Sequence, residues 1–197
     1  MAALWNTRIA LLTGLVVTLL GAFYIYQSPL PLNFSIPRPT TSNSVPGLKM
    51  SLSQTSLKGP TILVTLENNH PDTTYTILKW DTPLDASALN TGVFSIVDQT
   101  SNEEVGQIIL HVNRKMPPPP NQLVTLAPGT QEKVEVVFDK AWMPKRRSTY
   151  KISAKGMFKG VWAKPGDKVT RKELYGYAES PFAGRRFVTN EVVLEVR

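Results

Sequence analysis

The hydrophobic pattern divides the chain into an apolar leader and a longer region of alternating residues. Residues 9–26 carry no charge and are mostly apolar. At a rise of ~1.5 Å per residue, a helix of this length reaches about 27 Å, close to the thickness of a bilayer's hydrocarbon core. Trp5, Tyr24 and Tyr26 lie at its ends, where interfacial aromatic residues are common. The pattern therefore predicts one transmembrane signal-anchor helix over residues 9–26.

A cleaved signal peptide is the alternative interpretation of this leader. The apolar core of a signal peptide usually has about 7–15 residues and ends at a small-x-small site. The run here is longer, and cleavage after Ala22 or Ser28 would place Leu20 or Tyr26 at the third position before the cut. The sequence thus favours the anchor, with secretion after cleavage as the alternative.

Basic residues and prolines around the leader predict how the chain is organised. Arg8 precedes the apolar run, and no basic residue follows it until Arg38. The positive-inside rule then places residues 1–8 in the cytosol and the rest of this single-pass protein in a lumen or outside the cell. Residues 27–47 contain five prolines among Ser, Thr and Asn, which predicts an extended linker. Residues 48–197 form the predicted domain.

In that domain, apolar residues alternate with polar ones, as in half-buried strands. Leu48, Met50 and Leu52 are the first such set. The predicted strands are 48–53, 62–67, 75–80, 93–98, 106–113, 123–126, 133–138, 149–161 and 187–196. A helical signal comes from the capping box at Thr170–Glu173, with a stop at Gly176. The fold class is therefore all-β, an immunoglobulin-like β-sandwich.

Composition removes several kinds of chemistry. The chain has 197 residues, no cysteine and two histidines. The absence of cysteine excludes disulfides, thiolate metal centres and thiol nucleophiles. Two histidines provide few ligands for a metal site. We expect no cofactor and no enzymatic activity.

Basic side chains gather in the C-terminal half. Residues 49–139 contain six basic and ten acidic side chains, whereas residues 140–186 contain thirteen basic and three acidic ones. Along the predicted strand 149–161, lysines lie on the face opposite the apolar residues. The predicted basic patch comprises Lys145, Arg146, Arg147, Lys151, Lys155, Lys159, Lys164, Lys168, Arg171 and Lys172. The alternative is that these lysines protect an exposed strand edge from pairing with other chains.

Two histidines and two aspartates are the candidate residues for metal binding or acid–base chemistry. His70 lies in a predicted turn, and His111 lies within a predicted strand, so neither is expected to bind metal. Asp81 and Asp85 could act as a general acid–base pair, but hydrogen bonds within a turn explain both. A hydrolase with an unrecognised carboxylate site is the least favoured alternative.

Several segments together resemble a known domain. They are Leu66–Asn69, Leu78–Leu84, Gly92–Ile96, Val112–Lys115, Leu126–Gly129 and Tyr150–Ile152. In order and chemistry they resemble the N-terminal, non-catalytic β domain of fungal deuterolysin-type zinc metalloendopeptidases, over roughly residues 48–197. The resemblance implies a β-sandwich of propeptide-like, folding-assisting or inhibitory ancestry. It transfers no catalytic residue, because the His-Glu-x-x-His zinc motif is absent from this sequence.

These observations predict a non-enzymatic, membrane-anchored interaction module of the secretory pathway or cell surface. Binding is expected through a sheet face, a strand edge or the basic patch. The expected partners, besides the membrane contacted by residues 9–26, are a secreted protease, an anionic lipid or a glycan. Nucleic acid is not expected, because a lumenal domain does not meet it. A chaperone-like or inhibitory relative of a metalloprotease propeptide is the alternative function.

Overall fold

The computed structural model describes residues 43–56, 59–144 and 148–196. The predicted segments 1–8 and 9–26 lie outside this part of the chain, as do residues 27–42 of the predicted linker and Lys145, Arg146 and Arg147 of the basic patch. Val45 is only 2% exposed, so the last residues of the predicted linker pack against the domain.

The described residues form a β-sandwich, as the alternating pattern predicts. The strands are β1 (Leu48–Ser56), β2 (Thr61–Asn68), β3 (Tyr75–Leu78), β4 (Phe94–Asp98), β5 (Glu103–Glu104), β6 (Leu123–Leu126), β7 (Gln131–Val137), β8 (Ser148–Met157), β9 (Val161–Trp162), β10 (Arg186–Val188) and β11 (Val192–Val196). Helix α2 (Arg171–Tyr175) begins with the predicted capping box and has Gly176 as its C-cap. Four short 3-10 turns complete the elements: η1 (Ala88–Asn90), η2 (Pro120–Gln122), η3 (Gly166–Lys168) and η4 (Tyr177–Glu179).

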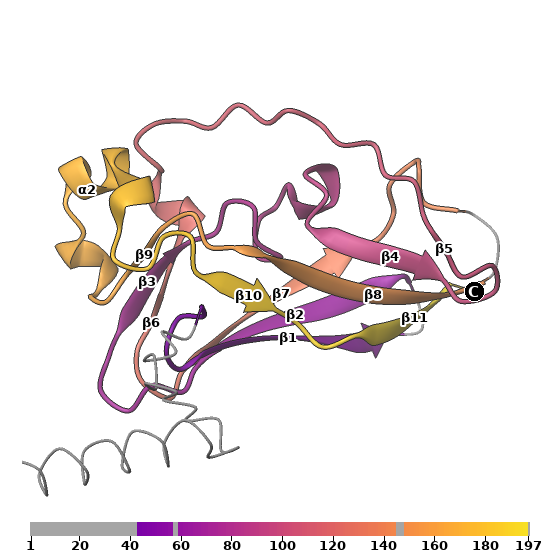
Figure 1. Cartoon of the computed structure of the whole chain (residues 1–197), viewed down its shortest axis with the longest axis horizontal. Coiled ribbons are helices and arrows are strands. Elements are labelled where there is room, and N and C mark those ends of the chain that lie inside the picture. Colours follow the sequence, from indigo (N-terminus) through magenta and orange to yellow (C-terminus); the bar gives the residue numbers. More distant parts are fainter. Residues whose placement is uncertain (1–42, 57–58, 145–147, 197) are drawn as a thin grey trace, which may run out of the picture. The chain divides into compact units, whose positions relative to one another are not determined.

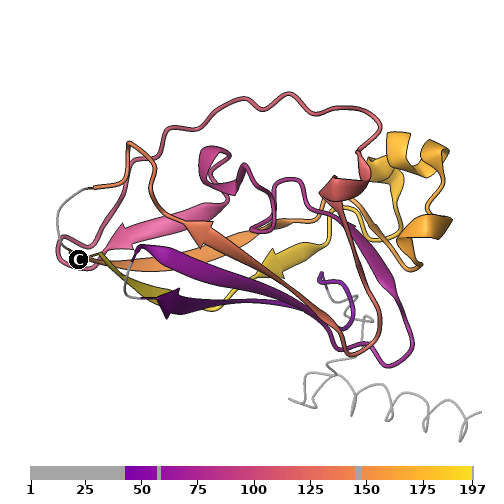
Figure 2. The same ribbon diagram turned by 180° about the vertical axis from the view of Figure 1, so that it is seen from behind.

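Two antiparallel sheets form the layers of the sandwich (Figure 1). One has the strand order β1-β2-β7, and the other has the order β10-β8-β4-β5, with β11 also paired to β8. A smaller sheet, β6-β3-β9, lies at the end of the sandwich near α2 (Figures 1 and 2). Strand β8 is therefore central in its sheet, with β4 on one side and β10 and β11 on the other.

The core follows from the alternation of side chains along these strands. From one layer, Ile62, Val64 and Leu66 of β2 are completely buried, and from the other, so are Ile96 of β4 and Ile152 of β8. A second cluster lies at the β6-β3-β9 end and contains Leu78, Trp80, Trp162 and Val169.

The Asn190 side chain joins the two layers at one edge. Its Nδ2 donates to Leu52 O at 2.9 Å, and its Oδ1 accepts from Leu52 N at 2.9 Å. The amide thus takes the place of a neighbouring strand for one residue of β1. It also lies where the predicted strand 187–196 divides into β10 and β11.

The prediction of a strand over residues 106–113 is wrong. This stretch belongs to a long extended segment, Val105–Pro119, which we call the strap (Figures 1 and 2). Val105 N donates to Ile96 O at 2.8 Å, but the next donor to β4 is the side chain of Gln107, whose Nε2 bonds Phe94 O at 2.8 Å. Because a side chain replaces the backbone donor, the strap covers the β4 edge without forming a ladder.

The predicted strand 149–161 also differs, since it divides into β8 and β9. Phe158 exchanges backbone hydrogen bonds with Arg185 and Gly184, which turns the chain before β9. The predicted alternation holds up to that point, because Tyr150, Ile152, Ala154 and Phe158 are all buried.

Candidate interaction surface

The five-stranded sheet buries one face in the core and exposes the other. Residues directly opposite each other in an antiparallel pair project from the same face. Arg186 of β10 is opposite Met157 of β8, and Val188 is opposite Lys155. On β11, Val193 is opposite Lys151 of β8. We call the set Lys155, Met157, Arg186, Val188 and Val193 the outer sheet face.

Three aliphatic side chains on this face are open to solvent. Met157 is 54% exposed, Val188 is 68% exposed and Val193 is 43% exposed. Single apolar side chains are common on protein surfaces, whereas a group on one face commonly indicates an interaction site. Here three neighbouring strands contribute to the group.

The two cations of the outer sheet face are available to a partner. Lys155 and Arg186 are both exposed. Within the described residues, neither side chain forms an ion pair. Lys151 differs, because its Nζ lies 3.4 Å from Glu191 Oε2. Positive charge is therefore concentrated at the β10 end of the face.

A groove continues this end of the face between β1 and β10. It is lined by Asn43, Ser44, Leu48, Lys49, Met50, Phe158, Arg186, Phe187 and Val188. Its walls are mostly apolar, while Lys49 and Arg186 provide cations. An extended or irregular polypeptide carrying both acidic and aliphatic side chains would meet complementary groups here.

Among the residues that the structure describes, the other lysines and arginines of the predicted patch do not form one surface of free charges. Lys159 Nζ lies 3.5 Å from Asp81 Oδ2, and Lys168 Nζ lies 3.5 Å from Asp167 Oδ2. The Arg171 guanidinium lies 5.7 Å from the ring centre of Tyr175. Lys172 is exposed on α2. Most of these charges already have partners within the chain.

Lys164 is the most tightly paired of them. Its Nζ lies 2.6 Å from Oε1 and 2.8 Å from Oε2 of Glu173. Mainly through this hydrogen bond, and through hydrogen bonds from the backbone and hydroxyl of Thr170, the pKa of Glu173 falls from 4.5 to about 2.

This pKa predicts how acid affects α2. A carboxylate whose pKa is lower in the folded state than in the unfolded state stabilises the fold at pH values above its unfolded-state pKa. This stabilisation is lost as the pH falls toward the folded-state pKa. We expect the stability difference between wild type and Glu173→Gln to be full above pH 4.5 and to shrink between pH 4.5 and about 2. Denaturant unfolding of both proteins across this interval measures it. A difference that is independent of pH would contradict the assignment.

Edge protection does not explain Lys151, because this residue is opposite Val97 of β4 on one side and Val193 of β11 on the other. Lys155 is opposite Val188 of β10 and lies one residue beyond the end of the β4 ladder at Ala154. These lysines project from the face of a central strand.

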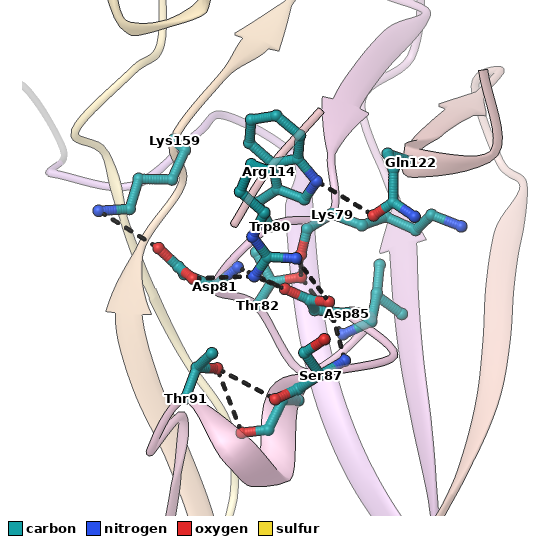
Figure 3. Close-up of polar contacts among 12 residues, drawn as sticks. Lys79, Trp80, Asp81, Thr82, Asp85, Ser87, Thr91, Arg114, Gln122 and Lys159 are labelled. Carbon is teal, nitrogen blue, oxygen red and sulfur yellow. Dashed lines mark hydrogen bonds and ion pairs between the residues drawn. The ribbon is translucent and has the colours of Figure 1, made fainter. Parts of the chain in front are cut away.

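Asp81 and Asp85 lie together, but in a charge-paired cluster (Figure 3). The Asp85 side chain is 1% exposed and contacts the Arg114 guanidinium, which also lies 3.3 Å from Asp81 Oδ1. Asp85 accepts further hydrogen bonds from the backbone N–H groups of Asp81 at 3.1 Å and Ser87 at 2.9 Å. Arg114 lies over the Trp80 ring, 5.4 Å from its centre. The cluster anchors the strap to the Trp80–Ser87 turn.

The histidines take ordinary structural positions. His70 Nδ1 accepts from the backbone N–H groups of Asp72 at 3.2 Å and Thr73 at 3.1 Å, which fixes the turn. Its ring packs edge-to-face against Tyr75, and burial raises the pKa of the Tyr75 hydroxyl. His111 is exposed on the strap. In the described part of the chain, no three metal-ligating side chains cluster.

Sequence reasoning missed the contributions of β10. Arg186 and Val188 alternate with buried Phe187, so the same period-two pattern could have placed them on one exposed face. Their position beside Lys155 could not be read from the sequence, because it depends on the pairing of β10 with β8.

Comparison with known proteins gives a relative and a family. An uncharacterized secreted protein of Arthroderma benhamiae is 32% identical over 114 residues. The match covers 56% of this chain and 57% of that protein, so the chain spans little more than half of its relative. Within the part that the structure describes, no helix has the length and apolarity needed to cross a bilayer. A model of an immunoglobulin-like domain matches residues 47–196, most of the chain. The chain therefore belongs to the immunoglobulin-like domain family.

Proposed function

We propose that this protein is a non-enzymatic interaction module that binds an acidic, partly apolar protein segment through the outer sheet face. The observation that carries the proposal is the pairing of exposed aliphatic side chains with cations on one face of the sheet: Val188 is opposite Lys155, and Met157 is opposite Arg186. Burying the aliphatic groups would provide affinity, and the cations would select an acidic partner.

A protein partner fits this surface better than a lipid or glycan does. The cations are few, and aliphatic side chains lie directly beside them. Anionic lipid headgroups are usually bound by clusters of about 4–8 basic residues, and among the described members of the predicted cluster Lys151, Lys159, Lys164 and Lys168 form ion pairs within the chain. Apolar contacts at the centre with charges around them are typical of protein interfaces.

Reversing both cations should weaken this binding. We expect Lys155→Glu together with Arg186→Glu to weaken binding of a synthetic peptide of alternating Glu and Leu by at least about tenfold, a loss of roughly 1.4 kcal/mol. Heteronuclear NMR titration of the domain measures the affinity and locates the peptide. A matched control is Lys133→Glu with Lys172→Glu, which makes the same charge change away from the outer sheet face. Equal weakening by both double variants, or peptide-induced shifts confined to other surfaces, would contradict the proposal.

Residues 9–26 support a membrane-tethered form of this module, with the domain on the non-cytosolic side. The description of the Arthroderma relative as secreted supports the alternative of a cleaved leader. Alkaline carbonate extraction of cells that make the full chain distinguishes the two. An anchored protein stays in the membrane pellet at its full mass, whereas a cleaved one appears in the medium with a mature amino terminus after residue 22 or later.

The resemblance to deuterolysin N-terminal domains supports a second proposal, an inhibitory or folding-assisting function. Its matching block from Leu78 to Leu84 contributes Trp80 and Asp81 to the cluster around Arg114 (Figure 3). The test adds the domain to a deuterolysin-type protease. Stoichiometric loss of protease activity would support inhibition, and unchanged activity and refolding yield would contradict it.

A further inference from the structure

Strand β7 forms an edge of the three-stranded sheet. It pairs with β2 along its whole length, and in the described part of the chain no strand pairs with its other side. The register between β2 and β7 contains no bulge, and β7 contains neither proline nor glycine. A regular edge of this kind is a template for another strand. The domain therefore presents an open edge that is seven residues long.

The backbone groups on this open edge belong to every second residue of β7. At the two ends of the pairing with β2, Phe138 N donates to Pro60 O at 2.7 Å, and Asn68 N donates to Thr130 O at 2.9 Å. Along an antiparallel ladder, hydrogen-bonded pairs alternate with pairs that are not hydrogen-bonded. The residues whose N–H and C=O groups point away from β2 are therefore Gln131, Lys133, Glu135 and Val137.

The order of the charges on β7 identifies a second copy of this chain as the strand that fits. When two identical strands pair antiparallel about a two-fold axis, residues equally far before and after the axis lie opposite each other. With the axis at Val134, Lys133 of each copy lies opposite Glu135 of the other. Both residues direct their backbone groups outward, so each of these two pairs is hydrogen-bonded as well. An axis at Lys133 or at Glu135 would instead place like charges opposite each other, which is unfavourable.

Lys133 and Glu135 are available for this pairing. Both are exposed, and within the described residues neither forms an ion pair. A lysine alone on an edge strand discourages pairing, whereas a lysine and a glutamate on either side of Val134 favour the same strand in reverse. Val134 itself is partly buried and packs against the main core cluster. The two copies of Val134 would therefore meet at the apolar margin of both cores.

We propose that the protein forms a two-fold symmetric dimer in which the β7 strands of two copies pair antiparallel about Val134. The two three-stranded sheets then become one continuous sheet, and each contact occurs twice. Strand β7 lies in the other layer from the outer sheet face and shares no residue with it, so the dimer and the proposed function can fail independently. A probe at Val137, opposite Gln131 in this register, would give an adduct of two copies of this chain, distinct from a partner held at Val188.

A single introduced thiol tests the dimer, because the chain contains no cysteine. Opposing residues of a pair that is not hydrogen-bonded have Cα atoms about 4.5 Å apart, a separation that a disulfide can span. Full chains that carry Val134→Cys and two different tags are produced in the same cells and oxidised. We expect a disulfide-linked pair that bears both tags.

Val192→Cys is the matched control. Val192 is also partly buried against the main core cluster, but it lies on β11 in the other layer. We expect the yield of the linked pair for Val134→Cys to be at least tenfold above that for Val192→Cys. A yield no higher than that of the control would overturn the dimer.

Charge exchange tests the register without changing the core, because both charged side chains are exposed. In the Val134→Cys chains, Lys133→Glu alone or Glu135→Lys alone should lower the yield several-fold, since each places like charges opposite each other in both pairs. The two changes together should restore the yield, because opposite charges again face each other. A double variant no better than either single variant would overturn the antiparallel register about Val134.

Discussion

Replacing Arg114 with methionine is expected to lower the free energy of unfolding of the domain by about 3–5 kcal/mol, the usual cost of removing one partner of a buried ion pair. The Asp85 side chain is 1% exposed, and Arg114 provides its counter-charge. Methionine keeps much of the side-chain volume over Trp80 but leaves the carboxylate buried without a cation. Denaturant unfolding monitored by tryptophan fluorescence measures the loss.

A double variant separates the charge effect from a packing effect. Asp85→Asn together with Arg114→Met removes both charges, so we expect it to be more stable than Arg114→Met alone. Asp81→Asn should have a much smaller effect, because the Asp81 side chain is 41% exposed. A loss below about 1 kcal/mol for Arg114→Met would show that this cluster does not stabilise the fold.

Trp162→Ala is expected to cost about 3–5 kcal/mol, as is typical of a fully buried tryptophan. Trp162 is 1% exposed and packs with Leu78, Trp80 and Val169 in the second core cluster. The cluster includes Leu78 of β3 and Trp162 of β9 at the end of the domain near α2 (Figure 1), so removing the indole would leave a cavity there. Thermal and denaturant unfolding measure the change.

Trp142 provides the matched control for this variant. It is partly buried at the margin of the main core cluster. Trp142→Ala should therefore cost less than half as much as Trp162→Ala. Equal costs would contradict the assignment of a separate, tightly packed cluster to the β6-β3-β9 end.

Local alternation was sufficient to predict the sandwich but not the strap. Each strand from β1 to β4 overlaps a predicted strand, because burial of every second residue shapes both the sequence and the sheet. Residues 106–113 are as apolar as a strand, yet Gln107 replaces a backbone donor and the ladder ends. Periodicity describes which residues prefer burial and does not show whether a neighbouring strand offers its edge.

The basic patch shows a similar limit for the candidate site. The lysine spacing in β8 correctly places Lys155 on the face opposite Ala154 and Ile152. It could not show that Lys164 binds Glu173 or that Lys159 lies beside Asp81, which comes from a distant part of the chain. The charge excess along a sequence thus overestimates the unpaired charge on the folded surface, because ion pairs between residues distant in the sequence neutralise part of that excess.

The most direct test of the proposed function asks what touches the outer sheet face in living cells. A photo-crosslinking amino acid is placed at Val188 in the full chain, and the matched control carries it at Val137. The proposal predicts a discrete protein adduct at position 188 that is absent at position 137 and is lost when Lys155→Glu and Arg186→Glu are added. No adduct at 188, or the same adduct at both positions, would contradict it.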